Sequence, residues 1–244
     1  MFGRRARIGI LVPPGNPTVE PELYRMVPDG VSLHFARLQS PPPDGPAGGA
    51  AGMEKRTRAY RDGLDGPTAA LGQVRPAVIV LAHTASSYAV GVGGEQPLVD
   101  RVTRLGGAPA LLAAHAVRDA LRHLGVSRLA LGTPYPESIS RQGRAYWEAS
   151  GFQIVGYHRL ADVVDIYAES EERAHELARR ADAPEAQAVL LSGTGLPTVA
   201  VLETLERELG KPVISSNQAC LWRALRLAGV PDAVPGFGRL LREP

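Results

Sequence analysis

The chain has 244 residues, 44% of them hydrophobic and 21% charged, and its 27 basic side chains nearly balance its 25 acidic ones. These values are typical of a globular protein, and no run of about five or six like charges suggests a nucleic-acid-binding arm. The single cysteine excludes an intramolecular disulfide. No apolar run reaches the roughly 18 residues of a membrane span, and no apolar signal segment follows the first arginines. We therefore expect a cytoplasmic protein with no membrane or nucleic-acid partner.

Short runs of Val, Ile, Leu and Ala alternate with amphipathic segments along the chain. Several runs are apolar on both faces, which is typical of strands covered by helices on both sides. Strands that alternate with helices predict an α/β fold with parallel sheets and right-handed crossovers. The expected strands cover 7–12, 31–38, 77–82, 128–132, 152–158, 188–192 and 212–216, and the expected helices cover 17–27, 51–72, 95–105, 112–124, 137–150, 170–182, 197–209 and 217–228.

Glycine and proline mark where this regular pattern stops. Residues 40–52 read SPPPDGPAGGAAG, so we expect a loop there, between the second strand and a long helix. Elsewhere, Gly125, Gly151, Gly210 and Gly229 each stand where a glycine in the left-handed conformation would end a helix.

Polar residues follow four of the expected strands. They are Asn16 and the segments 83–88, 133–135 and 192–196. In an open α/β sheet, ligands lie outside the carboxyl ends of the strands. These four segments therefore predict one site.

The two halves of the chain end a central strand in similar turns. Residues 82–85 read AHTA and residues 192–195 read SGTG, each with a threonine beside the central position and a helix expected to follow. This repeat predicts two pseudo-symmetric, Rossmann-like lobes, each with a short parallel sheet flanked by helices and with a ligand in the cleft between them. We expect the first lobe to comprise residues 1–112 and about 217–244, and the second to comprise 113–216.

Five segments in a fixed order resemble one enzyme family. They are LVPPGNPTVEPE at 11–22, VSLHFAR at 31–37, LGTPYP at 131–136, GRAYWEASGF at 143–152 and KPVISSNQA at 211–219. Together they resemble the maleate cis-trans isomerase and arylmalonate decarboxylase branch of the aspartate/glutamate racemase superfamily. The resemblance implies catalysis without a cofactor, on a small carboxylate held by backbone amides and hydroxyls.

The resemblance breaks at the two positions where the family places catalytic cysteines. One position holds His83 and the other holds Gly193. In the family that this chain resembles, isomerases and racemases use two facing cysteines. The decarboxylase keeps only the second cysteine, as a proton donor. Because a thiolate is the nucleophile that adds to an alkene, the two-cysteine mechanism cannot operate here.

Two histidines are candidates for proton transfer. His83 can give and take protons near neutral pH, and the alternative is a strand-end histidine bonded to local backbone. His115, where relatives tend to have serine or threonine, stands at the start of an expected helix facing the cleft. It could form an acid/base pair with His83, although we favour a capping or surface role. A metal site needs at least three protein ligands and no third is evident, so we expect no metal.

Hydroxyl groups near His83 predict a cradle for a carboxylate or an enediolate. Thr84, Ser86 and Ser87 follow the same strand, and Tyr135 corresponds to a pocket-lining tyrosine of the family. Ala85 stands where relatives often have a serine, so one donor is lost. Local turn chemistry is the alternative role of these hydroxyls.

The second turn supplies backbone donors. Ser192, Gly193, Thr194 and Gly195 precede an expected helix, so their amides are expected to suit an anion. Asn16 is expected to hydrogen-bond the substrate, with an Asx turn or helix cap as the alternative. Because Gly193 and Ala85 are smaller than the family's residues, we also expect a pocket larger than maleate requires.

Three other reactive residues are expected to be structural. Glu20 and Glu22 are two positions apart on a helix and do not share a face, so one is expected to brace the cleft and the other to be solvated. Cys220 lies among apolar residues inside the last helix and is expected to be a small buried hydrophobe.

These observations favour a lyase that decarboxylates or eliminates through an enolate-like intermediate, with His83 as proton carrier. One alternative is a maleate isomerase or amino-acid racemase that uses histidine in place of cysteine. Another is a non-catalytic carboxylate-binding relative. The expected partner is a small carboxylate, and a homodimer is possible because relatives are often dimers and Trp147 and Trp222 lie in the core or at an interface.

Overall fold

The computed structural model describes residues 2–40 and 50–243. Most of the loop expected over 40–52 lies outside these residues. Its expected end is wrong, because the first turn of a helix already begins at Ala50.

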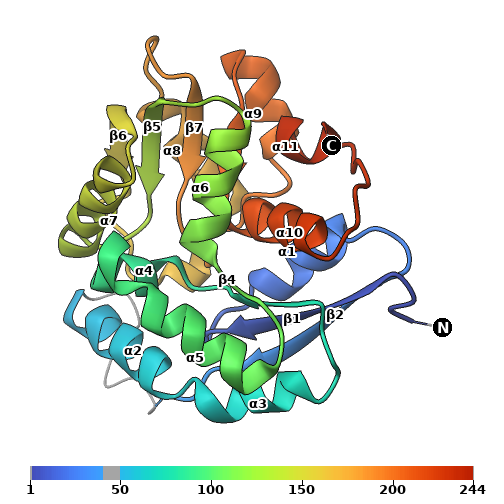
Figure 1. Cartoon of the computed structure of the whole chain (residues 1–244). Helices are drawn as coiled ribbons and strands as arrows, with labels where there is room; N and C mark the ends of the chain where they lie inside the picture. The colour runs from blue at the N-terminus through green and yellow to red at the C-terminus, as the bar shows by residue number, and fades with distance from the viewer. Residues whose placement is uncertain (1, 41–49, 244) are drawn as a thin grey trace.

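Two four-stranded parallel sheets form the centres of two lobes, one below the other in Figure 1. The strand orders are β2-β1-β3-β4 and β6-β5-β7-β8, so the second sheet repeats the order of the first. The predicted two-lobed α/β fold is confirmed, whereas the exact lobe boundaries stay a prediction. The strands are β1 (Ala6–Val12), β2 (Val31–Arg37), β3 (Val78–Leu81), β4 (Ala110–Leu112), β5 (Arg128–Thr133), β6 (Gln153–Arg159), β7 (Ala188–Leu191) and β8 (Val213–Ser215).

Helices cover both sheets and fill the space between them. Helices α3 and α5 pack together on the first sheet, α8 packs on the second, and α6 and α10 pack against each other between the lobes, with α1 beside α10 (Figure 1). The helices are α1 (Val19–Met26), α2 (Ala50–Asp62), α3 (Asp65–Gly72), α4 (Thr84–Val90), α5 (Gln96–Gly106), α6 (Ala113–His123), α7 (Glu137–Ala149), α8 (Glu171–Ala181), α9 (Leu202–Leu209), α10 (Ser216–Leu227) and α11 (Arg239–Arg242), with 3-10 turns η1 (Val92–Gly94) and η2 (Ile166–Ala168).

One hydrophobic core runs through both lobes. It joins Ile8 and Ile10 of β1 to Leu129 and Leu131 of β5, together with Trp147 of α7, and all five side chains are buried. Each such side chain contributes about 1.5–3 kcal/mol by leaving water. Separating the lobes would expose this apolar surface, so the core holds the cleft between the lobes in a fixed geometry.

Three expected elements differ in the structure. The helix expected over 51–72 is two helices, because the chain turns at Gly63, where a Cβ atom would lie 2.4 Å from the carbonyl oxygen of Gln39. Helix α4 follows His83 directly, without a turn between them. The helix expected over 197–209 begins only at Leu202, so the amides of 193–195 do not form a helix N-terminus.

Candidate active site

The two predicted turns meet across the boundary between the lobes. The hydroxyl of Thr84 donates to Ser216 Oγ at 3.2 Å, and the backbone amide of Gly193 donates to the same oxygen at 3.0 Å. Thr194 Oγ1 also donates to the carbonyl of Ala82 at 2.9 Å. Two donors from different lobes therefore converge on one buried oxygen atom, which is the geometry that binds a carboxylate or enolate oxygen.

Tyr135 lies against the glycine of the second turn. Gly193 has a φ of 131°, and a Cβ atom there would lie 3.0 Å from Tyr135 Oη. The extra space that we expected beside Gly193 is therefore taken by Tyr135. Burial raises the pKa of the Tyr135 phenol well above its usual value, and the neighbouring Tyr88 and Tyr167 add to this effect. The phenol stays protonated and can act as a hydrogen-bond donor.

His83 follows the end of β3, and its side chain is partly buried. Its Nδ1 atom is 2.8 Å from Ser86 Oγ, and the edge of the ring meets Tyr60 at a centroid distance of 5.1 Å. Burial, assisted by the positive charges of Arg56 and Arg61, lowers the pKa of His83 to about 3. The unliganded imidazole is therefore neutral at pH 7, and Ser86 orients the ring.

Asn16 joins the first lobe to the second turn. Its Oδ1 atom accepts hydrogen bonds from the amides of Thr18 at 2.8 Å and Val19 at 3.1 Å, and its Nδ2 atom donates to the carbonyl of Thr194 at 3.2 Å. Asn16 is 1% exposed. Asn16 therefore forms the Asx turn that was its alternative role. Its side chain also positions the turn that carries Gly193.

Glu22 braces the cleft, as expected for one of the two helix carboxylates. Its oxygens accept from the amides of Thr198 at 2.5 Å and Val199 at 2.7 Å, and from Asn217 Nδ2 at 2.6 Å. Burial raises the pKa of the Glu22 carboxyl, and these hydrogen bonds oppose the rise. Glu20, by contrast, is partly exposed in a surface ion pair.

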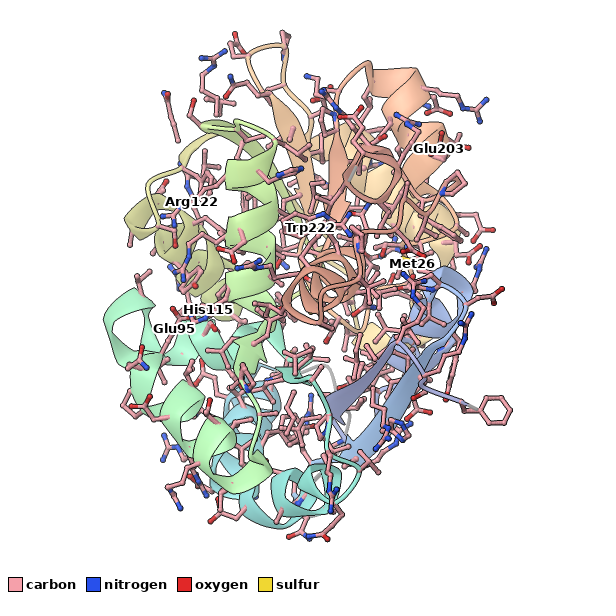
Figure 2. The ribbon with its side chains drawn as sticks, turned by 45° about the vertical axis from the view of Figure 1, so that its right-hand side comes forward. Met26, Glu95, His115, Arg122, Glu203 and Trp222 are labelled. Carbon is pink, nitrogen blue, oxygen red and sulfur yellow. The ribbon has the colours of Figure 1, made fainter. Side chains whose placement is uncertain are left out.

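His115 belongs to a different cluster from His83. Its Nε2 atom is 2.9 Å from Glu95 Oε2, and the Tyr146 hydroxyl donates to Glu95 Oε1 at 2.9 Å. Figure 2 shows His115 and Glu95 side by side. Burial would raise the pKa of Glu95, but hydrogen bonds led by the one from His115 hold it below its usual value. No described contact joins the two histidines, so the acid/base pair that we considered is not formed here.

Tyr88 is a site residue that the sequence did not single out. Its hydroxyl is hydrogen-bonded to Ser192 Oγ, and Trp147 Nε1 donates to the Tyr88 oxygen at 2.9 Å. The indole N–H can only donate, whereas either hydroxyl of the Tyr88–Ser192 pair can donate to the other. A tyrosine four residues after Thr84 on a helix was the available signal.

The remaining candidates have structural surroundings. Ala85 faces the space between α2, α4 and α7, and the ring of Tyr167 lies 2.8 Å from where a Cβ atom of Gly195 would be. Cys220 is 1% exposed, and burial raises the pKa of its thiol to about 12, which confirms its role as a buried hydrophobe. Among residues 2–40 and 50–243, no group of three or more His, Cys, Asp or Glu side chains is placed to hold a metal ion.

No described helix is long and apolar enough to cross a membrane. Trp147 is fully buried in the shared core, and Trp222 is 4% exposed against His123. Both tryptophans therefore belong to the interior of the chain, and the homodimer stays a prediction.

Comparison with known proteins places the chain in a family. It is 33% identical to the maleate isomerase of Nocardia farcinica over 97% of this chain and 96% of that protein. It is 32% identical to the arylmalonate decarboxylase of Bordetella bronchiseptica over 68% of this chain and 72% of that protein.

A solved structure of a cysteine variant of the N. farcinica maleate cis-trans isomerase, with a covalently bound succinylcysteine intermediate, superposes with a TM-score of 0.83. It is 30% identical and covers 97% of this chain and 98% of that one. The predicted relationship to a family of enzymes is confirmed. Residues 8–241 match the arylmalonate decarboxylase family, and the chain belongs to that family.

Proposed function

We propose that the chain is a cofactor-independent lyase that acts on a small carboxylic acid through an enolate-like intermediate. The observation that carries this proposal is the convergence of Thr84 Oγ1 and Gly193 N on one oxygen position, at 3.2 and 3.0 Å. Donors fixed in a buried site stabilise negative charge as it develops, and each one contributes about 10²–10³-fold to the rate.

The substrate carboxylate takes the oxygen position when Ser216 rotates away from it. The protonated Tyr135 phenol beside Gly193 supplies a further donor to the same end of the substrate. Charge that moves onto the carboxylate as the intermediate forms is then met by donors from both lobes. The buried surroundings strengthen each of these interactions relative to water.

His83 is the proposed proton carrier. A bound substrate anion offsets the positive charges of Arg56 and Arg61, which favours the imidazolium form. In a decarboxylation, the bond between the α-carbon and the departing carboxylate breaks and its electrons move into the enolate. Carbon dioxide leaves, and the His83 N–H then protonates the α-carbon. Solvent returns the proton to the ring.

Thiol addition fits this chain less well. The Nocardia farcinica relative has been captured with succinyl attached to a cysteine, whereas the one thiol here, Cys220, is buried with a raised pKa. A His-based isomerase or racemase would need a second reactive group facing His83. His115 has Glu95 as its partner instead. These contacts favour the lyase over the isomerase.

Proton NMR in deuterium oxide tests this proposal. Phenylmalonate, maleate, aspartate and glutamate are incubated with the wild type, His83→Gln and Thr84→Val, with His158→Gln as a control on β6. We expect loss of a carboxylate with deuterium at the α-carbon, a fall of about 10²-fold in Thr84→Val, and loss of turnover in His83→Gln.

Three outcomes would contradict the proposal. Full turnover in His83→Gln would remove the proposed proton carrier. Conversion of maleate to fumarate as the main reaction would favour the isomerase. No turnover of any acid, combined with a rise in melting temperature when an acid is added, would favour a carboxylate-binding protein.

A further inference from the structure

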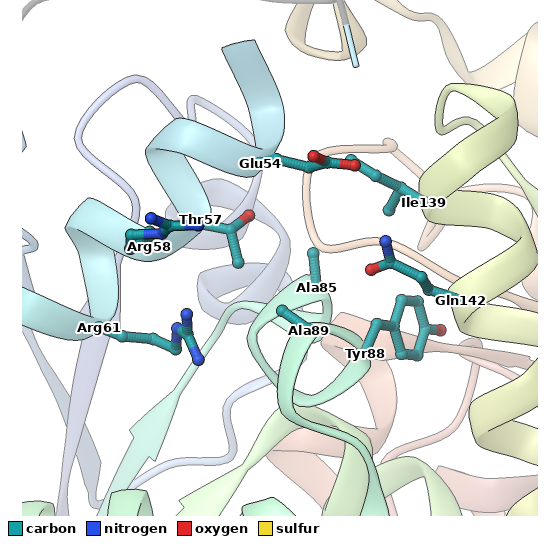
Figure 3. Close-up of a pocket in the computed structure, with 9 residues that line it drawn as sticks. All are labelled: Glu54, Thr57, Arg58, Arg61, Ala85, Tyr88, Ala89, Ile139 and Gln142. Carbon is teal, nitrogen blue, oxygen red and sulfur yellow. The ribbon is translucent and has the colours of Figure 1, made fainter. Parts of the chain in front are cut away.

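A pocket lies between the lobes, next to the candidate active site. It has a volume of about 290 Å³, is partly open to solvent, and is bordered by α2 on one side, α4 below and α7 on the other side (Figure 3). Its floor is formed by Ala85 and Ala89 with the ring of Tyr88, and Ile139 adds an apolar wall. Ser138 donates to Glu54 at 3.3 Å and so links α7 to α2.

Three charged side chains line the pocket, Glu54, Arg58 and Arg61, so its lining carries one net positive charge. Arg58 and Arg61 both line it, and neither guanidinium has an ion pair with any carboxylate of the described residues. The Nε atom of Arg61 is buried and has no acceptor. Figure 3 shows the Arg61 guanidinium pointing toward Ala89 across the pocket floor. A buried cationic N–H without an acceptor is costly, so this arrangement suits an anion.

The rest of the lining selects the kind of anion. Thr57 and Gln142 offer hydroxyl and amide groups from opposite walls, while the alanines, Tyr88 and Ile139 offer apolar surface. Fully hydrated inorganic anions gain little from apolar walls, whereas a carboxylate attached to a short hydrocarbon or a ring uses both surfaces. We propose that this pocket binds an organic monocarboxylate, with the carboxylate on Arg61 and the apolar part over α4.

The pocket lining includes neither Thr84 nor Gly193, but it begins at the neighbouring Ala85, and the pocket is coupled to His83. Arg61 lines the pocket and also contributes positive charge at the His83 ring. A carboxylate bound to Arg61 would offset that charge and make protonation of His83 easier. This coupling rests on the proposed function, whereas binding in the pocket does not.

Titration of the full-length ¹⁵N-labelled protein with benzoate tests binding directly. The signal followed is the Arg61 Nε–H resonance, which is assigned by its absence from Arg61→Gln. Benzoate is compared with benzyl alcohol, which lacks the charge, and with inorganic phosphate, which lacks the ring. Arg122→Gln is the matched control, because Arg122 is an exposed arginine on α6 outside the pocket.

We expect benzoate to move the Arg61 resonance and to bind about ten-fold more weakly to Arg61→Gln, the size of one charge-assisted hydrogen bond. Arg122→Gln and Thr84→Val should bind it as the wild type does. Ala89→Leu, which fills the floor without changing the charge, should also weaken binding and serves if Arg61→Gln does not fold.

Equal benzoate affinity in the wild type, Arg61→Gln and Ala89→Leu would overturn the proposal. So would phosphate binding as tightly as benzoate. Benzoate binding lost in Thr84→Val but kept in Arg61→Gln would place the anion in the cleft and also overturn it. Loss of turnover in His83→Gln, with benzoate binding unchanged, would support both proposals. Benzoate binding by a wild type that turns over no acid would support the pocket proposal and contradict the proposed lyase function.

Discussion

The hydroxyl of Thr84 and the backbone amide of Gly193 donate to one atom, the Oγ of Ser216, although they come from different lobes. Ser216 is the first residue of α10 and is fully buried. Its side-chain oxygen therefore fills the position that we assign to a substrate oxygen. Ser216 must compete with the substrate for these two donors.

Replacement of Ser216 by alanine removes this competitor. Unpaired buried donors cost about 1–3 kcal/mol until a ligand oxygen satisfies them, so we expect Ser216→Ala to be less stable and to bind malonate about ten-fold more tightly. Isothermal titration and thermal melts with and without malonate measure both effects. Ser150→Ala, which removes a buried hydroxyl just after the end of α7, is the control. Malonate binding no tighter than in the wild type would argue against the shared oxygen position.

A side chain at Gly193 should be poorly tolerated. The φ of 131° is strained for any L-residue, and a Cβ atom would lie 3.0 Å from Tyr135 Oη. We expect Gly193→Ala to lower the free energy of unfolding by about 1–3 kcal/mol. Urea unfolding of Gly193→Ala, Tyr135→Phe and the double variant measures the coupling. If the double variant is as destabilised as the sum of the two single variants, the contact with Tyr135 is unimportant.

The low pKa of His83 predicts a pH dependence of stability. Its pKa falls from 6.5 to about 3 on folding, so the unfolded chain binds more protons between these values. His83 therefore destabilises the protein as the pH falls from 6.5 toward 3. We expect His83→Gln to lose less stability than the wild type between pH 7 and pH 4.5. Urea unfolding at pH 7 and pH 4.5 measures this, with His158→Gln as the control. Identical losses of unfolding free energy in all three proteins would show that His83 is not desolvated.

Glu22 should contribute more to stability than its neighbour Glu20. It accepts two backbone amides and the Asn217 side chain, whereas Glu20 makes a partly exposed ion pair. Each hydrogen bond to a charged group contributes about 1.5–3 kcal/mol, so Glu22→Ala should lower the free energy of unfolding by several kcal/mol and Glu20→Ala by about 0–1 kcal/mol. Chemical denaturation of the two variants compares them directly. Similar losses of stability in the two variants would mean that the hydrogen bonds to Glu22 are not formed in solution.

His115 should matter for stability and not for proton transfer. Its partner Glu95 is 3% exposed and also accepts from Tyr146 of the other lobe. His115→Gln should therefore lower the melting temperature through a loss of about 1–3 kcal/mol while kcat stays within about two-fold of the wild type. A fall in kcat as large as that of His83→Gln, with an altered pH profile, would instead support an acid/base pair of His83 and His115.

The long apolar and amphipathic runs were sufficient to predict most strands and helices. Several short elements were not predicted, among them β4 and α4, and for these two there is a physical reason. Strand β4 has three residues, Ala110–Leu112, which is too short for a period and merges with the helix that follows. Helix α4 has the sequence TASSYAV, which has no amphipathic stripe, and it is held by packing against α2 and α7.

The candidate site, like the fold, was only partly predictable from the sequence. The segments that contain His83, Thr84 and Gly193 were singled out because they follow strands whose ends converge, and the family resemblance marked His83 and Gly193 within them. The partners that fix them were not predictable, because they lie far away in sequence. Glu22 and Asn217 are 195 positions apart, and Tyr88 and Ser192 are 104 apart. No local pattern encodes such contacts, which arise only when both lobes fold onto the shared core.

The core shared by the two lobes has a consequence for the speed of ligand exchange. An enzyme whose lobes swing apart admits its ligand on the slow scale of hinge motion, about microseconds to milliseconds. Here that swing would expose Trp147 and the apolar side chains of β1 and β5 to water. In the proposed mechanism, a substrate oxygen instead enters its position when one hydroxymethyl group, that of Ser216, rotates. Such local rotations are intrinsically far faster than domain movements, even when burial slows them. On the proposed function, ligand entry is therefore governed by a rotamer and not by a hinge.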